Sequence, residues 1–554
     1  MRIAVAQLDP VVGAFEANVK KLKEAYQRAC TKKARLLITP ELGVCGYPPH
    51  DLVERPEIFE RNDRAIEDLL GATRGHSCAL AVGHIAPNPS GIGRAAQNVV
   101  TILEDGKRVF RQAKTLLPTY DVFDETRYFE PASEISTWDC DGTRIAMAIC
   151  EDLWAEDPAL GRRLYGRNPV ECYRDSLADL IISISASPYE WAKRPRRERI
   201  HADIARNLKV PLVYVNQVGA TDEILFDGGS FAIDSKGVLA GRLPFFRTSF
   251  GLLETTEAGG LHWETPSSEA LVQGEPEEIG VLCAGLIMGI RDYFQRTGFK
   301  SAILGLSGGI DSAVVAVLAA QALGPKNVLG IAMPSQFSSS HSMEDAQLLA
   351  AALGIRFDVK PIKFLFSVSS RELADTGGQL NPLAQENLQS RLRGLMLMTV
   401  ANNTGGLVLT TGNKSELATG YCTMYGDMVG ALAPIGDVLK TRVYELARYL
   451  NLAFGKPIPE RSITKPPSAE LRPNQTDQDS LPPYDDLDAL LHEYLERNAP
   501  LEDLIGKYGP WARDVLRKVE INEYKRRQTA PVLKVSSKAF GIGRRVPIAK
   551  HWDI

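Results

Sequence analysis

The chain has few cysteines, and none of them forms a metal-binding pattern. Eight cysteines are scattered over 554 residues. No Cys-x-x-Cys pair occurs, and no histidine is spaced to complete a zinc site. This argues against a zinc module and favours a reducing compartment, so we expect a cytoplasmic protein.

Long apolar runs and a strong net charge are also missing. No stretch of about 18 apolar residues could span a membrane, and the start, MRIAVAQLDP, resembles no signal peptide. A net charge of -4 and a pI near 6.2 argue against a dedicated nucleic-acid binder. The basic run Lys193 to Arg199 has no base-stacking aromatic beyond Trp191, so we interpret it as a solvated helix start or a subunit contact. We therefore expect neither a membrane nor a nucleic-acid partner.

The length predicts more than one domain, and two large domains fit best. The stretch from about 248 to 278 is rich in Gly, Thr, Ser and Glu and only weakly periodic. It is therefore the best candidate for a boundary. We predict a first domain over 1–245, a linker over 246–279 and a second domain over 280–554.

The first domain has an α/β pattern. Short apolar runs alternate with amphipathic segments at 17–30, 57–70 and 197–208. Turn residues at 105–106, 141–142 and 235–237 predict hairpins, so the sheets should be partly antiparallel.

Three polar residues follow predicted strands of this domain, namely Glu41, Lys114 and Cys150. Together they form a workable acyl-transfer set, because a carboxylate can take the thiol proton while an ammonium stabilises the thiolate and the oxyanion. Taken alone, each residue is more readily interpreted as structural, since cysteine is commonly a buried small hydrophobe and Glu or Lys at a strand end is commonly solvated.

The sequence around these residues resembles the nitrilase superfamily. The matching blocks, in the expected order, are PELGVCGYPPHDL, KTLLPTYDVFDETRYF and AICEDLW. The resemblance implies a four-layer αββα sandwich in which Glu41 is the general base, Lys114 the oxyanion stabiliser and Cys150 the nucleophile. It also implies a glutamine-binding set consisting of Tyr120, Glu125, Ser187 and Lys193. An extra-looking segment, 161–174, departs from the family pattern.

The second domain opens on a glycine-rich turn, Ser307-Gly-Gly-Ile-Asp-Ser312, between an apolar strand-like run and a helix-like run. Glycine lets backbone amides approach an anion, and the helix that follows adds its N-terminal donors, so the turn predicts a phosphate site. It fits neither G-x-x-x-x-G-K-[ST] nor G-x-G-x-x-G. It resembles the SGGxDS loop of the ATP pyrophosphatases that release AMP, which implies that Asp311 holds magnesium beside the leaving pyrophosphate.

Strand-like runs at 302–306, 328–333, 355–359 and 407–410 alternate with helices, which predicts a Rossmann-like parallel sheet. Ligands of such sheets bind at the carboxyl ends of the strands. Thr411 and Glu416 follow the fourth run, and Asn387 and Arg391 share one helix face.

Together these pieces resemble the synthetase domain of the NAD+ synthetases over 280–554. The matching blocks include GLSGGIDS, QENLQSRLRG and LTTGNKSELATGYCTMYGDMVG. The resemblance implies Mg2+ with ATP as co-substrate, and Asp311 and Glu416 as the metal ligands. The implied ATP contacts are Gly305, Leu306, Ser307, Gly308, Gly309, Ile310, Asp311, Ser312, Thr411 and Lys440, and the implied deamido-NAD+ contacts are Asn387, Glu416, Tyr421 and Lys525.

Two long loops, 334–342 and 459–486, admit two interpretations. They match loops that close over the active site in the same family, with Lys465 and Ser468 as nucleotide contacts. The alternative interpretation is a plain mobile surface loop in each case.

A nitrilase-like amidase joined to an AMP-forming pyrophosphatase resembles the two-domain glutamine-dependent NAD+ synthetases of bacteria. This implies small-molecule substrates (glutamine, ATP and deamido-NAD+), a sheltered path for ammonia and a homo-oligomer. GMP and asparagine synthetases are enzyme alternatives, but their glutaminase halves use a Cys-His-Glu triad or an N-terminal cysteine, and residue 2 here is Arg. A nucleotide-binding regulator without turnover should lack Asp311, Cys150 or Lys114, and all three are present.

Overall fold

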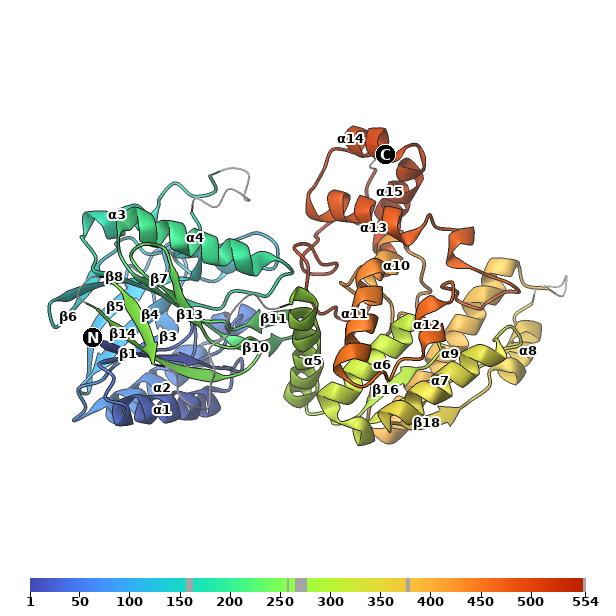
Figure 1. Cartoon of the computed structure of the whole chain (residues 1–554), viewed down its shortest axis with the longest axis horizontal. Coiled ribbons are helices and arrows are strands. Elements are labelled where there is room, and N and C mark those ends of the chain that lie inside the picture. Colours follow the sequence, from blue (N-terminus) through green and yellow to red (C-terminus); the bar gives the residue numbers. More distant parts are fainter. Residues whose placement is uncertain (156–162, 257–258, 265–276, 375–378, 552–554) are drawn as a thin grey trace. The chain divides into compact units, whose positions relative to one another are not determined.

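The computed structural model describes residues 1–155, 163–256, 259–264, 277–374 and 379–551. The chain separates into two compact units (Figure 1). Unit 1 contains Met1–Thr221 and Leu225–Pro276, and unit 2 contains Asp222–Ile224 and Glu277–Ile554. Each unit has an apolar core of its own.

Unit 1 is built on two sheets. The first has the order β15 (Leu261–Glu264), β14 (Ser249–Thr255), β1 (Arg2–Gln7), β2 (Leu36–Ile38), β3 (Ala79–Pro87), β4 (Ala96–Glu104) and β5 (Lys107–Ala113). The second has the order β13 (Leu239–Arg242), β12 (Phe231–Ile233), β9 (Leu212–Asn216), β8 (Leu180–Ser185), β7 (Thr143–Ile149) and β6 (Thr137–Cys140). A small separate hairpin pairs β10 (Val218–Thr221) with β11 (Ile224–Asp227).

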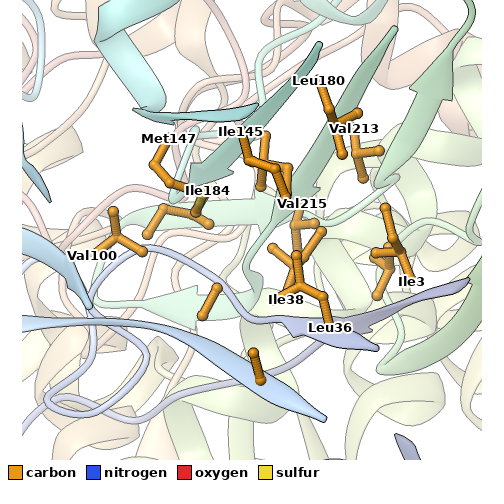
Figure 2. Packing of buried hydrophobic residues seen from close by; sticks show 14 of the residues in the cluster. Ile3, Leu36, Ile38, Val100, Ile145, Met147, Leu180, Ile184, Val213 and Val215 are labelled. Carbon is orange, nitrogen blue, oxygen red and sulfur yellow. The ribbon is translucent and has the colours of Figure 1, made fainter. Parts of the chain in front are cut away.

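The two sheets face each other across one apolar core (Figure 2). Ile3 and Ile38 of the first sheet pack in the same cluster as Ile145, Leu180 and Val213 of the second. Helices α1 (Phe15–Thr31) and α2 (Glu57–Thr73) lie on one side, and α3 (Pro169–Asp175) and α4 (Lys193–Leu208) on the other (Figure 1). This confirms the expected αββα layering.

Helix α1 shows why these segments become outer layers. It buries Phe15, Val19, Leu22 and Tyr26, which recur every three or four residues, and turns its charged residues outward. One apolar stripe at this spacing suits a helix that covers a sheet. The predicted hairpins also form, since β4 pairs with β5, β6 with β7 and β12 with β13, all antiparallel.

The predicted linker, 246–279, differs from the structure. Residues 249–255 form β14, which pairs antiparallel with β1, and 261–264 form β15 on its outer edge. Residues 257–258 and 265–276 of that range lie outside the described residues, as do 161–162 of the extra segment that departed from the family pattern. The β14 strand escaped prediction because its partner, β1, lies about 250 residues away in the sequence, so no local turn marks the pairing.

Unit 2 contains a four-stranded, all-parallel sheet with the order β18 (Arg356–Val359), β17 (Val328–Ala332), β16 (Ala302–Gly305) and β19 (Leu407–Val408). This confirms the parallel-sheet prediction. The surrounding longer helices are α5 (Glu278–Thr297), α6 (Ile310–Leu323), α7 (Ser340–Leu353), α8 (Lys363–Glu372), α9 (Pro382–Thr404) and α11 (Lys440–Ala453). Helix α6 buries every residue from Ser312 to Ala320, because its sequence offers no polar face.

A helical cluster completes unit 2. It comprises α10 (Lys414–Thr419), α13 (Tyr484–Leu491), a short π-helix (His492–Glu496), α14 (Leu501–Tyr508), α15 (Trp511–Ile521) and α16 (Glu523–Arg526). Leu417, Leu487, Leu516 and Val519 share its apolar core. The predicted long loop 459–486 is partly helical, because it contains α12 (Glu460–Thr464) and one 3-10 turn at 477–479. In the described part of the chain, no helix combines the length and apolarity needed to cross a membrane.

Candidate active sites

Cys150 lies where β7 ends and a 3-10 helix (Cys150–Leu153) begins. It is buried and has a backbone φ of 45°, an uncommon conformation for a residue other than glycine. The Asp152 carboxylate accepts the N–H of Ile149 (3.0 Å) and the N–H groups of Thr115 (2.9 Å) and Leu116 (2.8 Å). Asp152 therefore fixes the cysteine turn against the segment that follows Lys114.

Lys114 joins two buried carboxylates. Its ammonium donates to Glu41 Oε1 (2.7 Å) and to Glu125 Oε1 (2.8 Å). Glu41 also accepts from Asn98 Nδ2 (2.7 Å) and, on its other oxygen, from the N–H of Ala186 (2.9 Å). The structure thus brings together Glu41, Lys114 and Glu125, as the sequence predicted.

The electrostatics of this cluster suit a thiol that needs a base. Burial, reinforced by the charge of Glu41 and only partly offset by Lys114, raises the pKa of Cys150 above its ordinary range. Burial opposes the charge on Lys114, but Glu125 and Glu41 outweigh it and raise the pKa of Lys114 well above its usual value. The resting state is therefore a protonated thiol beside a permanent ammonium.

The remaining predicted glutamine contacts surround this cluster. Tyr120 donates its hydroxyl to both carboxylate oxygens of Glu151 (3.0 Å each), and Ser187 is buried just beyond β8. Lys193 Nζ donates to the carbonyl of Pro188 (3.2 Å) and lies 5.5 Å from the centre of the Trp154 ring. Trp154 closes the 3-10 turn that Cys150 opens.

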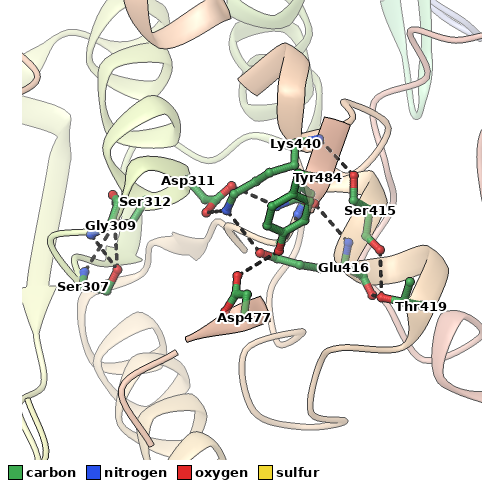
Figure 3. Close-up of polar contacts among 12 residues, drawn as sticks. Ser307, Gly309, Asp311, Ser312, Ser415, Glu416, Thr419, Lys440, Asp477 and Tyr484 are labelled. Atoms are coloured by element: carbon green, nitrogen blue, oxygen red, sulfur yellow. Dashed lines mark hydrogen bonds and ion pairs between the residues drawn. The ribbon is translucent and has the colours of Figure 1, made fainter. Parts of the chain in front are cut away.

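The glycine-rich turn of unit 2 links β16 to α6, which begins at Ile310 (Figure 3). Side chains fold the turn on itself, because Ser307 Oγ accepts the N–H of Gly309 (3.1 Å) and Ser312 Oγ donates to the Gly309 carbonyl (3.0 Å). Gly308 has a φ of 75°, and a Cβ there would lie 2.2 Å from the carbonyl oxygen of Ser342. Glycine is therefore required at 308 by both conformation and space.

Three groups converge behind this turn (Figure 3). Lys440 Nζ donates to Asp311 Oδ2 (2.5 Å) and to Glu416 Oε1 (3.5 Å). Asn413, the N-cap of α10, donates its side-chain amide to Asp311 Oδ1 (2.9 Å). Burial and the charge of Asp311 raise the pKa of Glu416 to about 8, against the opposing charge of Lys440. Asp311 and Glu416 thus both accept from the ammonium of Lys440, and the shift favours a proton on Glu416.

A cavity of about 290 Å³ connects these features. Most of the residues predicted to contact ATP line it: Gly305, Leu306, Ser307, Gly309, Ile310, Asp311, Ser312, Thr411 and Lys440. Glu416 and Tyr421, two of the predicted deamido-NAD+ contacts, also line the cavity. So do Lys465 and Ser468 of the loop 459–486, which were predicted as nucleotide contacts. Gly308, Asn387 and Lys525 are not among the described residues that line the cavity.

Asn387 and Lys525 nevertheless meet at one segment beside the cavity. Asn387 accepts the hydroxyl of Thr423 (2.9 Å), and the Lys525 ammonium donates to the carbonyls of Gly420 (2.6 Å) and Cys422 (3.0 Å). Tyr421 lies between these contacts and lines the cavity.

Comparison with known proteins agrees with this division. The carbon-nitrogen hydrolase family model matches residues 2–253, and the NAD synthase family model matches residues 282–529. The chain is 44% identical to a glutamine-dependent NAD(+) synthetase of Synechocystis sp., over 99% of this chain and 98% of the relative. It is 38% identical to the same enzyme of Thermotoga maritima, over 100% of this chain and 99% of the relative.

The chain belongs to the glutamine-dependent NAD(+) synthetase family. A solved member of that family from Acinetobacter baumannii, in complex with adenosine diphosphate, superposes with a TM-score of 0.77 at 36% identity, over 99% of this chain and 98% of the other. A member from Cytophaga hutchinsonii shares the fold, with a TM-score of 0.81 at 20% identity.

Family membership raises the question of a metal. Among the described residues, no group of three or more His, Cys, Asp or Glu side chains could hold one. Asp311 and Glu416 do gather carboxylate oxygens around a single cation, the ammonium of Lys440. Oxygen donors of this kind suit Mg2+, which is commonly bound by one or two carboxylates together with substrate phosphates, so the residues fit a magnesium ion.

Several residues that shape the two sites escaped sequence reasoning. Glu151 and Asp152 directly follow Cys150, the predicted nucleophile, and Asn413 lies three residues before Glu416. The only available signal was their adjacency to predicted residues, because what each one does depends on a partner from another element.

Proposed function

We propose that this chain catalyses the ATP-dependent amidation of deamido-NAD+ to NAD+, with ammonia taken from glutamine and with AMP, pyrophosphate and glutamate as the other products. One observation carries the proposal. A buried cysteine with a Lys–Glu pair and a glycine-rich phosphate turn with a shared carboxylate pair occur on one chain of this family.

In the glutaminase half-reaction, Glu41 takes the proton of Cys150 as the sulfur attacks the side-chain amide carbon of glutamine. Lys114 stabilises the oxyanion, since it keeps its charge between two carboxylates. Glu41 returns the proton to the departing ammonia, which leaves a thioester on Cys150. A water molecule that Glu41 deprotonates then releases glutamate.

In the synthetase half-reaction, the nicotinate carboxylate of deamido-NAD+ attacks the α-phosphorus of ATP. Pyrophosphate leaves into the turn formed by Ser307 to Ser312, whose backbone N–H groups and following helix receive anions. Ammonia then displaces AMP from the mixed anhydride. Asp311 and Glu416 would hold Mg2+, which would neutralise charge on the leaving pyrophosphate. Lys440 provides a fixed positive charge in the same place.

We also propose a cytoplasmic homo-oligomer as the working form. The compartment is supported by the eight cysteines, all of which are free thiols. Ammonia has a pKa close to that of a lysine amine, about 10, so it must be kept from water to stay nucleophilic. An assembly that shelters it would serve this need, and light scattering would measure the assembly's mass.

The test supplies ATP, deamido-NAD+ and either glutamine or ammonium chloride, and it follows NAD+ and AMP together. We expect equal yields of NAD+ and AMP from both nitrogen sources. Formation of ADP instead of AMP, or binding of ATP without its consumption, would refute the proposed reaction.

A further inference from the structure

The side-chain amide of Asn216 hydrogen-bonds to both the N–H and the carbonyl group of Ser187. Asn216 ends β9 and is fully buried. Its Oδ1 accepts the Ser187 N–H (2.8 Å), and its Nδ2 lies 3.2 Å from the Ser187 carbonyl oxygen. The same Nδ2 lies 3.0 Å from Asp227 Oδ1 and 3.2 Å from the Gly228 carbonyl oxygen. The single amide therefore satisfies both polar backbone groups of Ser187.

Asp227 connects the Asn216 amide to Arg197 of helix α4. Its carboxylate pairs with both terminal nitrogens of Arg197 (3.1 and 2.5 Å), and both side chains are buried. Arg197 lies four residues after Lys193 on α4, which is one helical turn. The Arg197–Asp227 pair thus holds the start of α4, where Lys193 stands, against the same Asn216 that holds Ser187.

The Ser187 turn is also held from the catalytic side. The preceding residue, Ala186, donates its N–H to Glu41 Oε2 (2.9 Å). One short turn is therefore fixed between the proposed general base and Asn216. Side-chain bonds take the place of strand pairing here, because β8 ends at Ser185.

We propose that Asn216 is a positioning residue for glutamine. It acts with the Arg197–Asp227 pair to set the spacing of Ser187 and Lys193, the two proposed glutamine contacts. The inference rests on the proposed function, because it takes Ser187 and Lys193 as glutamine contacts.

Energetics favour this over a packing role. A buried amide or ion pair costs free energy unless every group is bonded, and an apolar residue of similar size would serve packing alone. Here the Asn216 amide binds the Ser187 backbone and Asp227, and the Asp227 carboxylate binds Arg197, which lies one helical turn after Lys193. The Asn216 amide and the Asp227 carboxylate are both bonded through their two polar atoms, and buried networks of this kind favour one geometry.

The test uses the full-length chain with Asn216→Ala and, as a matched control, Asn62→Ala. Asn62 is equally buried in unit 1 but contacts His84 instead. We expect Asn216→Ala to raise the KM for glutamine at least tenfold while kcat changes less than threefold, and Asn62→Ala to leave both unchanged. Ammonium-supported synthesis should stay unchanged in both variants and reports an intact unit 2, while the rate of Cys150 labelling described below reports the integrity of the thiol site in unit 1.

A second measurement separates substrate positioning from damage to the thiol site. Iodoacetamide labelling of Cys150, followed by mass spectrometry of its peptide, should proceed at the wild-type rate in Asn216→Ala. Protection by glutamine should need at least tenfold more glutamine. Equal changes in labelling rate and protection, or no change in either, would overturn the inference.

Ser187→Ala separates a failure of the role inferred for Asn216 from a failure of the proposed glutamine contact at Ser187. If it weakens glutamine protection and Asn216→Ala does not, the inference fails alone. If Ser187→Ala has no effect, the proposed glutamine contact fails, and the inference fails with it.

Discussion

The ammonium of Lys440 lies 2.5 Å from a carboxylate oxygen of Asp311, and both residues line the cavity behind the phosphate turn. Glu416 shares the same ammonium at 3.5 Å. Burial opposes the charge on Lys440, but Asp311 and Glu416 outweigh it and raise the pKa of Lys440 above its ordinary range. Lys440 therefore holds a positive charge at the place where the proposed mechanism requires phosphate charge to be received.

Replacing Lys440 by methionine should remove this cation and leave two carboxylates facing the phosphates. We expect NAD+ formation from either glutamine or ammonium to fall at least about a hundredfold, as when one electrostatic donor is lost from an active site. Basal glutamine hydrolysis should persist. A matched change at the exposed Lys326 should leave all three rates intact. A Lys440→Met enzyme with normal synthesis would show that this charge is not used.

Gly308→Ala should disable the phosphate turn, because a Cβ would meet the Ser342 carbonyl oxygen at 2.2 Å in a left-handed backbone conformation. Gly354→Ala is the control, since Gly354 has a similar φ of 66° with no atom within 4 Å of the added Cβ. The control should cost about 1 kcal/mol of stability and keep ammonium-supported synthesis. If both variants synthesise NAD+ from ammonium at equal rates, the Ser342 carbonyl group must move to make room for the added methyl group.

Lys114→Met should strongly destabilise unit 1, because it leaves Glu41 and Glu125 buried without their shared counter-charge. Breaking a buried ion pair on one side costs about 3–5 kcal/mol. Urea denaturation should show this loss, and adding Glu125→Gln to Lys114→Met should restore part of it by removing one of the carboxylates. A double variant no more stable than Lys114→Met would contradict this explanation.

Glu125 should make stability depend on pH. Burial raises the pKa of Glu125 from 4.5 to about 7, with Lys114 opposing the shift and Glu41 adding to it. Since the folded state holds this proton more tightly, its stabilising contribution is complete below about pH 4.5 and is lost as the pH rises to about 7. Relative to Glu125→Gln, the wild-type protein should lose unfolding free energy across this range. Parallel pH curves for the two proteins would rule out this titration.

The sequence predicted the parts of each site that follow a strand. Cys150 follows β7 directly, and the phosphate turn lies between β16 and α6. The point where a short apolar run gives way to polar or glycine residues marks where such strands end, so their carboxyl-end residues can be found without a structure. The roles of Glu41, Lys114 and Cys150 came from family resemblance, and the structure adds the contacts by which Lys114 joins the carboxylates.

The features that escaped prediction depend on partners far away in the sequence. Asn216 reaches Ser187, and β14 pairs with β1 across about 250 residues. No local period or turn residue reports such contacts. Composition also misled, since the Pro- and Ser-rich range 459–486 contains helix α12. The structure leaves the roles of Asn387 and Lys525 as predictions and shows both bonded to the segment from 420 to 423.

The most direct test of the two-site account is NAD+ synthesis by Cys150→Ala with each nitrogen source in turn. The proposed mechanism uses Cys150 as the nucleophile of the glutaminase half-reaction only, so glutamine should support no detectable synthesis. Ammonium chloride should support it within about twofold of the wild-type rate. Loss of both activities, or retention of glutamine-supported synthesis, would contradict the division of labour between the two sites.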